Sequence, residues 1–227
     1  MNFRPDINAL RAIAVLGVVF FHFLGSALPG GFAGVDVFFV ISGFLMTSII
    51  FRGMQAQTFK VTDFYIARAH RIVPALTVLC LALMAFGWFY LHPRDLATMG
   101  KHALGSLSFS SNVMYLKESG YFDEASKEKW LLHTWSLSLE WQFYLVYPIV
   151  LVVLRKFFSI HSLRYFLLCG AMASFVLSIY ATGRWPSSAF YLLPSRAWEM
   201  LLGGLAFAYP LQMSAAKKKW VEWIGVG

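Results

Sequence analysis

The sequence predicts an all-α fold, that of a polytopic helical membrane protein. Of its 227 residues, 59% are hydrophobic and 18% aromatic, and the mean hydropathy is +0.62. Charged residues make up 13% of the chain, against about 25% in soluble domains. The net charge is +8, but in such a chain the basic residues belong first to the membrane edges, so we expect no nucleic-acid partner. Cys80 and Cys169 lie in apolar segments without metal-ligand spacing, which predicts core thiols and no metal site.

Six apolar segments are candidates for membrane-spanning helices, at residues 8–24, 35–51, 72–91, 134–154, 163–182 and 194–210, and the start of a seventh lies near Trp220. A cleaved signal peptide is the alternative for the first segment, but Asp6 and His22 would be unusual in one. Residues 96–115 lie in a long polar loop and have helix-compatible spacing, which predicts an interfacial or re-entrant helix. We see no repeat or linker, so residues 1–227 are predicted to form a single membrane domain.

The distribution of basic residues predicts a cytoplasmic N-terminus. With that orientation the cytoplasmic side receives twelve of the nineteen lysines and arginines, namely Arg4, Arg11, Arg52, Lys60, Arg68, Arg71, Arg155, Lys156, Arg164, Lys217, Lys218 and Lys219. Cytoplasmic loops of membrane proteins carry such an excess of Lys and Arg. The long loop at residues 92–133 is then on the outer side.

Arg11 and His22 lie eleven residues apart in the first predicted span, about three helical turns, so both side chains project from one face. Ionisable side chains in a membrane helix are costly and by default face a bundle interior or a water-filled cavity. Arg11 is placed to clamp a phosphate near the cytoplasmic face, and His22 is a candidate general base or acyl carrier in the outer half. The alternative is that Arg11 snorkels to the interface and His22 hydrogen-bonds between helices.

A glycine-rich segment opens the second predicted span, GGFAGVDVFFVISGF at residues 30–44. Its glycines permit tight turning and close backbone approach. Asp36 is a candidate to pair with His22 and orient it, as a carboxylate orients an imidazole in hydrolase triads, and capping of the helix is the alternative. We expect Ser42 and Gly43 to be small-residue packing positions.

Further charged residues lie at the edges of later spans. Arg68 and Arg71 are one helical turn apart, a spacing that suits a phosphorylated ligand but equally suits lipid headgroups. Glu140 lies about two turns into the fourth span, where it is a candidate to bind a sugar hydroxyl or to balance an arginine. Arg196 and Glu199 have the i,i+3 spacing of an ion pair on one helix.

Four segments in this order resemble the acyltransferase 3 family of membrane proteins. They are Arg-x10-His at Arg11 and His22, GGFAGVDVFFVISGFL at residues 30–45, Arg-x-x-Arg at Arg68 and Arg71, and HTWSLSLEWQFYLVYP at residues 133–148. The resemblance extends over essentially the whole chain. The family often has two adjacent glutamates where this chain has Glu140 followed by Trp141, so a role that needs the second carboxylate is not carried over.

The resemblance implies an O-acyltransferase of the bacterial inner membrane. Such a protein takes an acyl group, usually acetyl, from cytoplasmic acyl-CoA and passes it to a hydroxyl of a surface or lipid-linked glycan, such as O-antigen or exopolysaccharide. It further implies that His22 is catalytic and that Arg11, Arg68 and Arg71 contact the coenzyme. We add Asp36 and Glu140 as candidate catalytic residues.

Two other functions remain open from the sequence. An exporter of an anionic or acylated small molecule would use the same intramembrane charges, and a non-catalytic membrane scaffold would need none of them. Since the family domain usually has about ten spans, we expect the chain to be a truncated form of the domain, with impaired activity if it stands alone.

Overall fold

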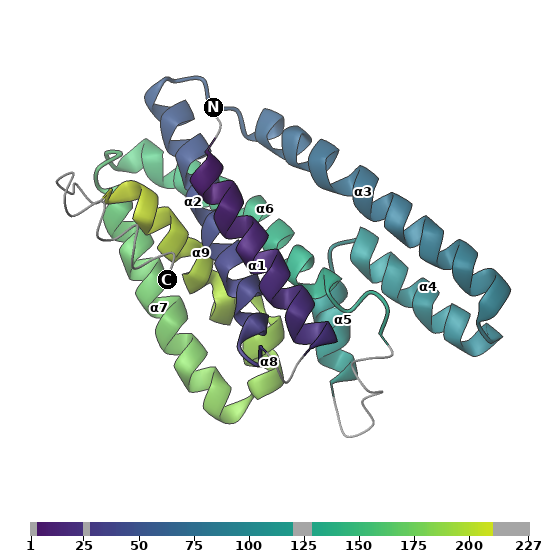
Figure 1. Cartoon of the computed structure of the whole chain (residues 1–227). Helices are drawn as coiled ribbons and strands as arrows, with labels where there is room; N and C mark the ends of the chain where they lie inside the picture. The colour runs from purple at the N-terminus through teal and green to yellow at the C-terminus, as the bar shows by residue number, and fades with distance from the viewer. Residues whose placement is uncertain (1–3, 25–27, 120–128, 211–227) are drawn as a thin grey trace.

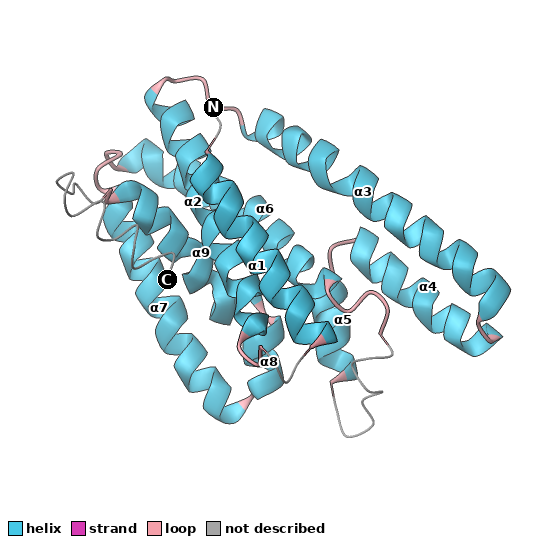
Figure 2. Cartoon of the chain, viewed as in Figure 1, coloured by secondary structure: helices cyan, strands magenta, loops and turns pink. Residues whose placement is uncertain are grey.

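The computed structural model describes residues 4–24, 28–119 and 129–210, and all regular elements in these ranges are helices (Figures 1 and 2). The all-α prediction is confirmed. In chain order the helices are α1 (Pro5–Phe23), the 3-10 turn η1 (Gly31–Ala33), α2 (Gly34–Gln55), α3 (Val61–Tyr90), α4 (Pro93–Leu107), α5 (Ser111–Glu118), α6 (Thr134–Phe157), α7 (Leu163–Arg184), α8 (Pro186–Tyr191) and α9 (Leu193–Ala208).

Five of the described helices are long and apolar enough to cross a membrane: α1, α2 together with η1, α3, α6 and α7. They correspond to the first five predicted spans. The sixth predicted segment forms α9, which has 16 residues. A helix of that length is about 24 Å long, less than the roughly 30 Å hydrocarbon core of a bilayer. The predicted seventh segment near Trp220 lies outside the described residues.

Helix α3 begins earlier than the sequence analysis predicted. Its 30 residues start at Val61, where Lys60 is still in an extended conformation. Residues 61–71 contain neither glycine nor proline, so nothing in them interrupts the helix. Arg68 and Arg71 therefore lie on the first part of a rigid helix and not in a loop.

The described part of the long loop between α3 and α6 contains two helices where one was predicted. Helix α4 lies along the second half of α3, and α5 follows it beside α6 (Figure 1). The break between them is at Phe109, whose φ of 54° is in the left-handed region that no α-helix can continue through. A small apolar cluster of Leu76, Cys80, Ala103, Phe109 and Leu131 joins α3, α4 and this turn.

The centre of the molecule is a tight crossing of α2 and α9. A Cβ atom at Gly43 would overlap the carbonyl oxygen of Met200, and one at Gly203 would overlap that of Val40. Helix association in lipid depends on such close packing of small residues, because lipid tails remove the hydrophobic driving force. The expectation that Gly43 is a packing position is confirmed.

Helix α1 rests on η1 and α2 along one face, and most of its apolar side chains are exposed. Gly31 and Gly34 lie against the carbonyl oxygens of Gly17 and Ala14, as the glycine-rich segment predicted. Ala14 is the buried residue of α1, and its remaining apolar side chains, such as Ile13 and Leu16, are exposed. In a bilayer such a face meets lipid, where a helix satisfies all its backbone hydrogen bonds internally.

We expect Gly43→Ala to destabilise the protein by about 1–3 kcal/mol, the usual cost of overpacking, because the new methyl group must push α2 and α9 apart. The control is Gly183→Ala on α7, where a Cβ atom would meet nothing within 4 Å. Thermal unfolding in detergent should show a lower midpoint for the first variant and no loss for the second. Equal midpoints would contradict the close approach of α2 and α9.

Candidate active site

Three of the predicted arginines line one cavity of about 190 Å³ between four helices. Arg11 comes from α1, and Arg68 and Arg71 come from α3, with Glu140 from α6 on the same wall. The remaining lining residues are Ile41, Ser42, Leu45, Met46, Ile72, Leu137 and Tyr144. Three guanidinium groups against one carboxylate make the cavity cationic, and the planar fork of arginine suits phosphate oxygens.

Arg68, one of the three cavity arginines, packs against an aromatic ring. Its guanidinium lies 5.6 Å from the centroid of the Phe64 ring, a cation–π contact. Its Nε–H is buried and donates to no hydrogen-bond partner among the described residues. A buried N–H without a hydrogen-bond partner is costly, so this group is set to donate to a bound anion.

Glu140 is held in the cavity by hydroxyl groups. Ser42 from α2 and Tyr144, one turn further along α6, both donate to its Oε1 atom. Ser42 was expected to be a packing residue, but its hydroxyl faces the cavity and fixes the carboxylate.

His22 lies outside this cavity, near the end of α1, beside a second imidazole. Its ring centroid is 4.6 Å from that of His133, with the ring planes at 83°. Its Nδ1 is 2.8 Å from the carbonyl oxygen of Val18, and because a carbonyl can only accept, Nδ1 carries the hydrogen. In the neutral ring Nε2 then has a free lone pair. Burial and, to a smaller extent, the neighbouring His22 hold the pKa of His133 below its usual range, which favours the neutral form of that ring.

The cavity and the histidine pair lie along the same sides of two antiparallel helices. On α1, Arg11 lines the cavity and His22 contacts His133. On α6, Glu140 lines the cavity, and His133 directly precedes the first residue of the helix. Eleven residues advance an α-helix by about three turns, and seven by about two, so each set projects in one direction. Glu140 and His133 are therefore arranged along α6 in the same way as Arg11 and His22 are along α1.

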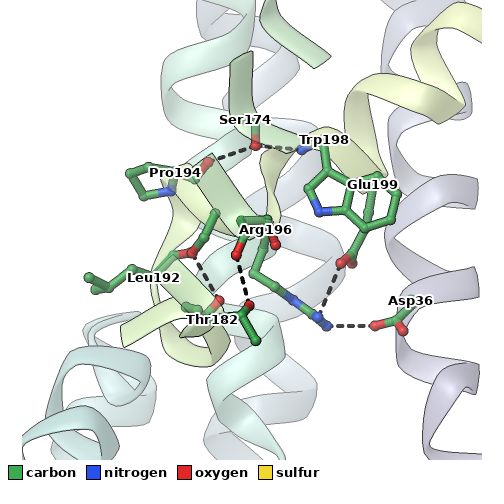
Figure 3. A network of polar contacts seen from close by, with 11 residues as sticks. Asp36, Ser174, Thr182, Leu192, Pro194, Arg196, Trp198 and Glu199 are labelled. Carbon is green, nitrogen blue, oxygen red and sulfur yellow. Dashed lines mark hydrogen bonds and ion pairs between the residues drawn. The ribbon is translucent and has the colours of Figure 1, made fainter. Parts of the chain in front are cut away.

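Asp36 does not orient His22, in contrast to the expectation from the sequence. Its carboxylate accepts a 2.5 Å hydrogen bond from Arg196 of α9, and Arg196 also lies 3.1 Å from Glu199 (Figure 3). The predicted Arg196–Glu199 pair is thus present, with Asp36 as its third member. The rings of Phe39, Trp135 and Phe190 surround the same guanidinium at 5.6–5.8 Å. This cluster links α2 to α9. Because Asp36 is paired with Arg196, its carboxylate does not bond His22.

Comparison with known families gives one match that covers almost the whole chain. The model described as "Acyltransferase domain", that of the acyltransferase 3 family, matches residues 4–227. The chain belongs to the acyltransferase 3 family. No solved structure matches it.

Several relatives of this acyltransferase domain have printed names that describe O-acetyltransferases. The peptidoglycan O-acetyltransferase OatA of Listeria monocytogenes is 34% identical over 92% of this chain. The putative peptidoglycan O-acetyltransferase YrhL of Bacillus subtilis is 32% identical over 96%, and the O-acetyltransferase OatA of Staphylococcus aureus is 33% identical over 92%. The matches cover 34–35% of these relatives, so the chain spans about a third of their length.

Three residues of the acyltransferase domain's site have contacts that the sequence analysis did not assign. His133 and Tyr144 lie in the motif at residues 133–148 but have no predicted role, and Ser42 is predicted to be a packing position. The sequence does indicate His133 and Tyr144, because their spacing from Glu140 places all three residues on one face of a helix. Ser42 gave no such signal, since its partner is 98 residues away.

We expect Arg196→Gln to destabilise the domain by about 3–5 kcal/mol, because it leaves the buried Glu199 and the partly exposed Asp36 without their shared counter-ion. Arg184→Gln is the matched control, since Arg184 is exposed at the end of α7 and contacts the ring of Tyr180. Thermal unfolding in detergent is the measurement. Similar midpoints for the two variants would mean that the cluster in Figure 3 does not hold α2 and α9 together.

Proposed function

We propose that this domain is the membrane part of an O-acetyltransferase, which transfers an acetyl group from cytoplasmic acetyl-CoA to a hydroxyl of an extracytoplasmic glycan. The observation that carries the proposal is the convergence of Arg11, Arg68 and Arg71 in one cavity, on the side of α1 that also bears His22. The names of the relatives support a glycan acceptor, and peptidoglycan is the first candidate.

The arginine cavity is the proposed binding site for the donor. Coenzyme A carries several phosphate groups at one end and a thioester at the other, joined by a long uncharged arm. The phosphates match the guanidinium groups, and the predicted cytoplasmic N-terminus places the cavity toward the side where acyl-CoA is made. Lipid headgroups remain the alternative ligand for the same arginines.

His22 is the proposed catalytic base. Its Nε2 lone pair takes the proton of the acceptor hydroxyl, the oxygen attacks the thioester carbonyl, and the carbon–sulfur bond breaks. The thiolate then receives the proton, so the products are the acetyl ester and free coenzyme A. In the other route Nε2 attacks the thioester first, and the acceptor hydroxyl displaces the acetyl group from the imidazole. Both routes need the tautomer that the Val18 carbonyl imposes on the ring.

His22→Gln should lower acetyl transfer by a factor of about 10²–10⁴, the usual contribution of a general base, while binding of coenzyme A is kept. Arg68→Gln should instead raise the KM for acetyl-CoA by about tenfold or more, because it removes a charged hydrogen-bond donor. Arg155→Gln is the control, since its guanidinium is exposed and bonds the carbonyl of Phe158. The assay follows labelled acetyl from acetyl-CoA into glycan in membranes that contain the full-length protein.

An active His22→Gln variant would contradict the catalytic assignment, and unchanged donor kinetics in Arg68→Gln would contradict the donor site. A protein that exports a small molecule without acetylating any glycan would instead be the transporter considered above. Incubation with labelled acetyl-CoA and no acceptor separates the two chemical routes, because label on His22 is formed only in the second.

A further inference from the structure

Glu140 shares a small cavity with three arginines and yet forms no ion pair with them. Within the described residues, its carboxylate is bonded by hydroxyl groups and by none of the cavity arginines. Arg68 lies close enough to Glu140 for the two charges to interact. Opposite charges attract more strongly in a protein cavity than in water, so an unformed pair needs a physical cause. The contacts of Glu140 and Arg68 supply one.

Two hydroxyl groups hold the Glu140 carboxylate. Ser42 of α2 and Tyr144 of α6 both donate to its Oε1 atom. Tyr144 is buried and Ser42 is half-buried, so neither donor is free to turn away into solvent. Tyr144 is one helical turn from Glu140, whereas Ser42 comes from the neighbouring helix. The carboxylate is therefore fixed to the wall that α2 and α6 form together.

An aromatic ring holds the guanidinium of Arg68. The ring of Phe64 lies 5.6 Å from this guanidinium and contacts the Tyr144 ring edge to face, with the two ring centroids 6.4 Å apart. Tyr144 thus touches both sides, since its hydroxyl bonds Glu140 and its ring packs against Phe64. Each charge is held by neutral groups, and the buried Nε–H of Arg68 keeps its capacity to donate to a ligand.

We propose that Ser42 and Tyr144 are positioning residues of the donor site, which keep the Glu140 carboxylate off Arg68 so that this arginine is free to bind a phosphate of the donor. This inference rests on the proposed function and deepens it. Without the donor, Glu140 still offsets part of the positive charge of the arginines, which lowers the cost of placing them in membrane helices. When a hydroxyl is lost, the carboxylate can pair with Arg68, and the donor must then displace it.

The test measures kcat and KM for acetyl-CoA with the full-length protein in membranes, and the Kd of coenzyme A for the same protein in detergent. Tyr144→Phe should raise KM and Kd by about tenfold, the effect of one hydrogen bond to a charged group, with a smaller effect on kcat. Ser42→Ala should act in the same direction. Adding Glu140→Gln to either variant should return both constants to those of Glu140→Gln alone, because an amide has no charge to pair with Arg68.

Tyr147→Phe is the matched control. Tyr147 is a buried residue of α6 whose hydroxyl lies 2.6 Å from that of Thr47 on α2, so it links the same two helices without lining the cavity. Its loss should leave KM and Kd unchanged. Equal effects of Tyr144→Phe and Tyr147→Phe, or an effect of Tyr144→Phe that Glu140→Gln does not remove, would mean looser helix packing and overturn the proposal.

Two further outcomes separate this inference from the function on which it rests. Unchanged KM and Kd in both Tyr144→Phe and Ser42→Ala, with Arg68→Gln still raising KM, would overturn the positioning role and leave the proposed function intact. If the unsubstituted protein neither transfers acetyl from acetyl-CoA nor binds coenzyme A, the proposed function fails, and this inference fails with it.

Discussion

Charged side chains within membrane helices constrain this structure more than any other feature. A single Arg, Lys or Asp at the centre of a helix costs about 2.5–3.5 kcal/mol on insertion scales, so such groups must meet a partner or water. The chain groups them in two places. Arg196 is enclosed by Asp36, Glu199 and three aromatic rings, so the protein itself supplies its counter-ions. Arg11, Arg68 and Arg71 instead surround a cavity with one carboxylate, an arrangement suited to an anion from outside the protein.

Close packing of small residues brings together the helices that form the Arg196 cluster and the arginine cavity. The contact of Gly43 with Met200 and of Gly203 with Val40 brings α2 and α9 close enough for Asp36 to reach Arg196. Gly31 and Gly34 hold α1 against α2, which fixes the direction in which Arg11 and His22 point. Helix α6 then presents His133, Leu137 and Glu140 toward the same region. Removing the close contacts would therefore disturb the site from a distance.

Much of this arrangement could be predicted from the sequence because it is periodic. The spacing of Arg11 and His22, of Arg68 and Arg71, and of Arg196 and Glu199 fixes which side chains share a face once a helix is assumed. Five predicted spans correspond to long helices of the structure. The helical start of α3 was missed because its polar residues resemble a loop in a hydropathy profile.

Contacts between distant segments could not be predicted in this way. Asp36 is paired with Arg196, 160 residues away, and not with His22, since periodicity says nothing about which helices become neighbours. The same holds for the hydrogen bond from Ser42 to Glu140 and for the contact of His22 with His133. The break between α4 and α5 could not be predicted because it depends on one left-handed residue, Phe109, which is not a glycine.

The central claim is the proposal that one passage connects the arginine cavity, on the predicted cytoplasmic side, with the histidine pair toward the opposite membrane face. Cysteine accessibility tests it most directly, in sealed vesicles of either orientation and in a protein without its native cysteines. Ile72→Cys should react with a membrane-impermeant thiol reagent from the cytoplasmic face and be protected by coenzyme A, while His133→Cys should react from the opposite face. Labelling of both positions from one face, or of Ile72→Cys without protection, would contradict the account.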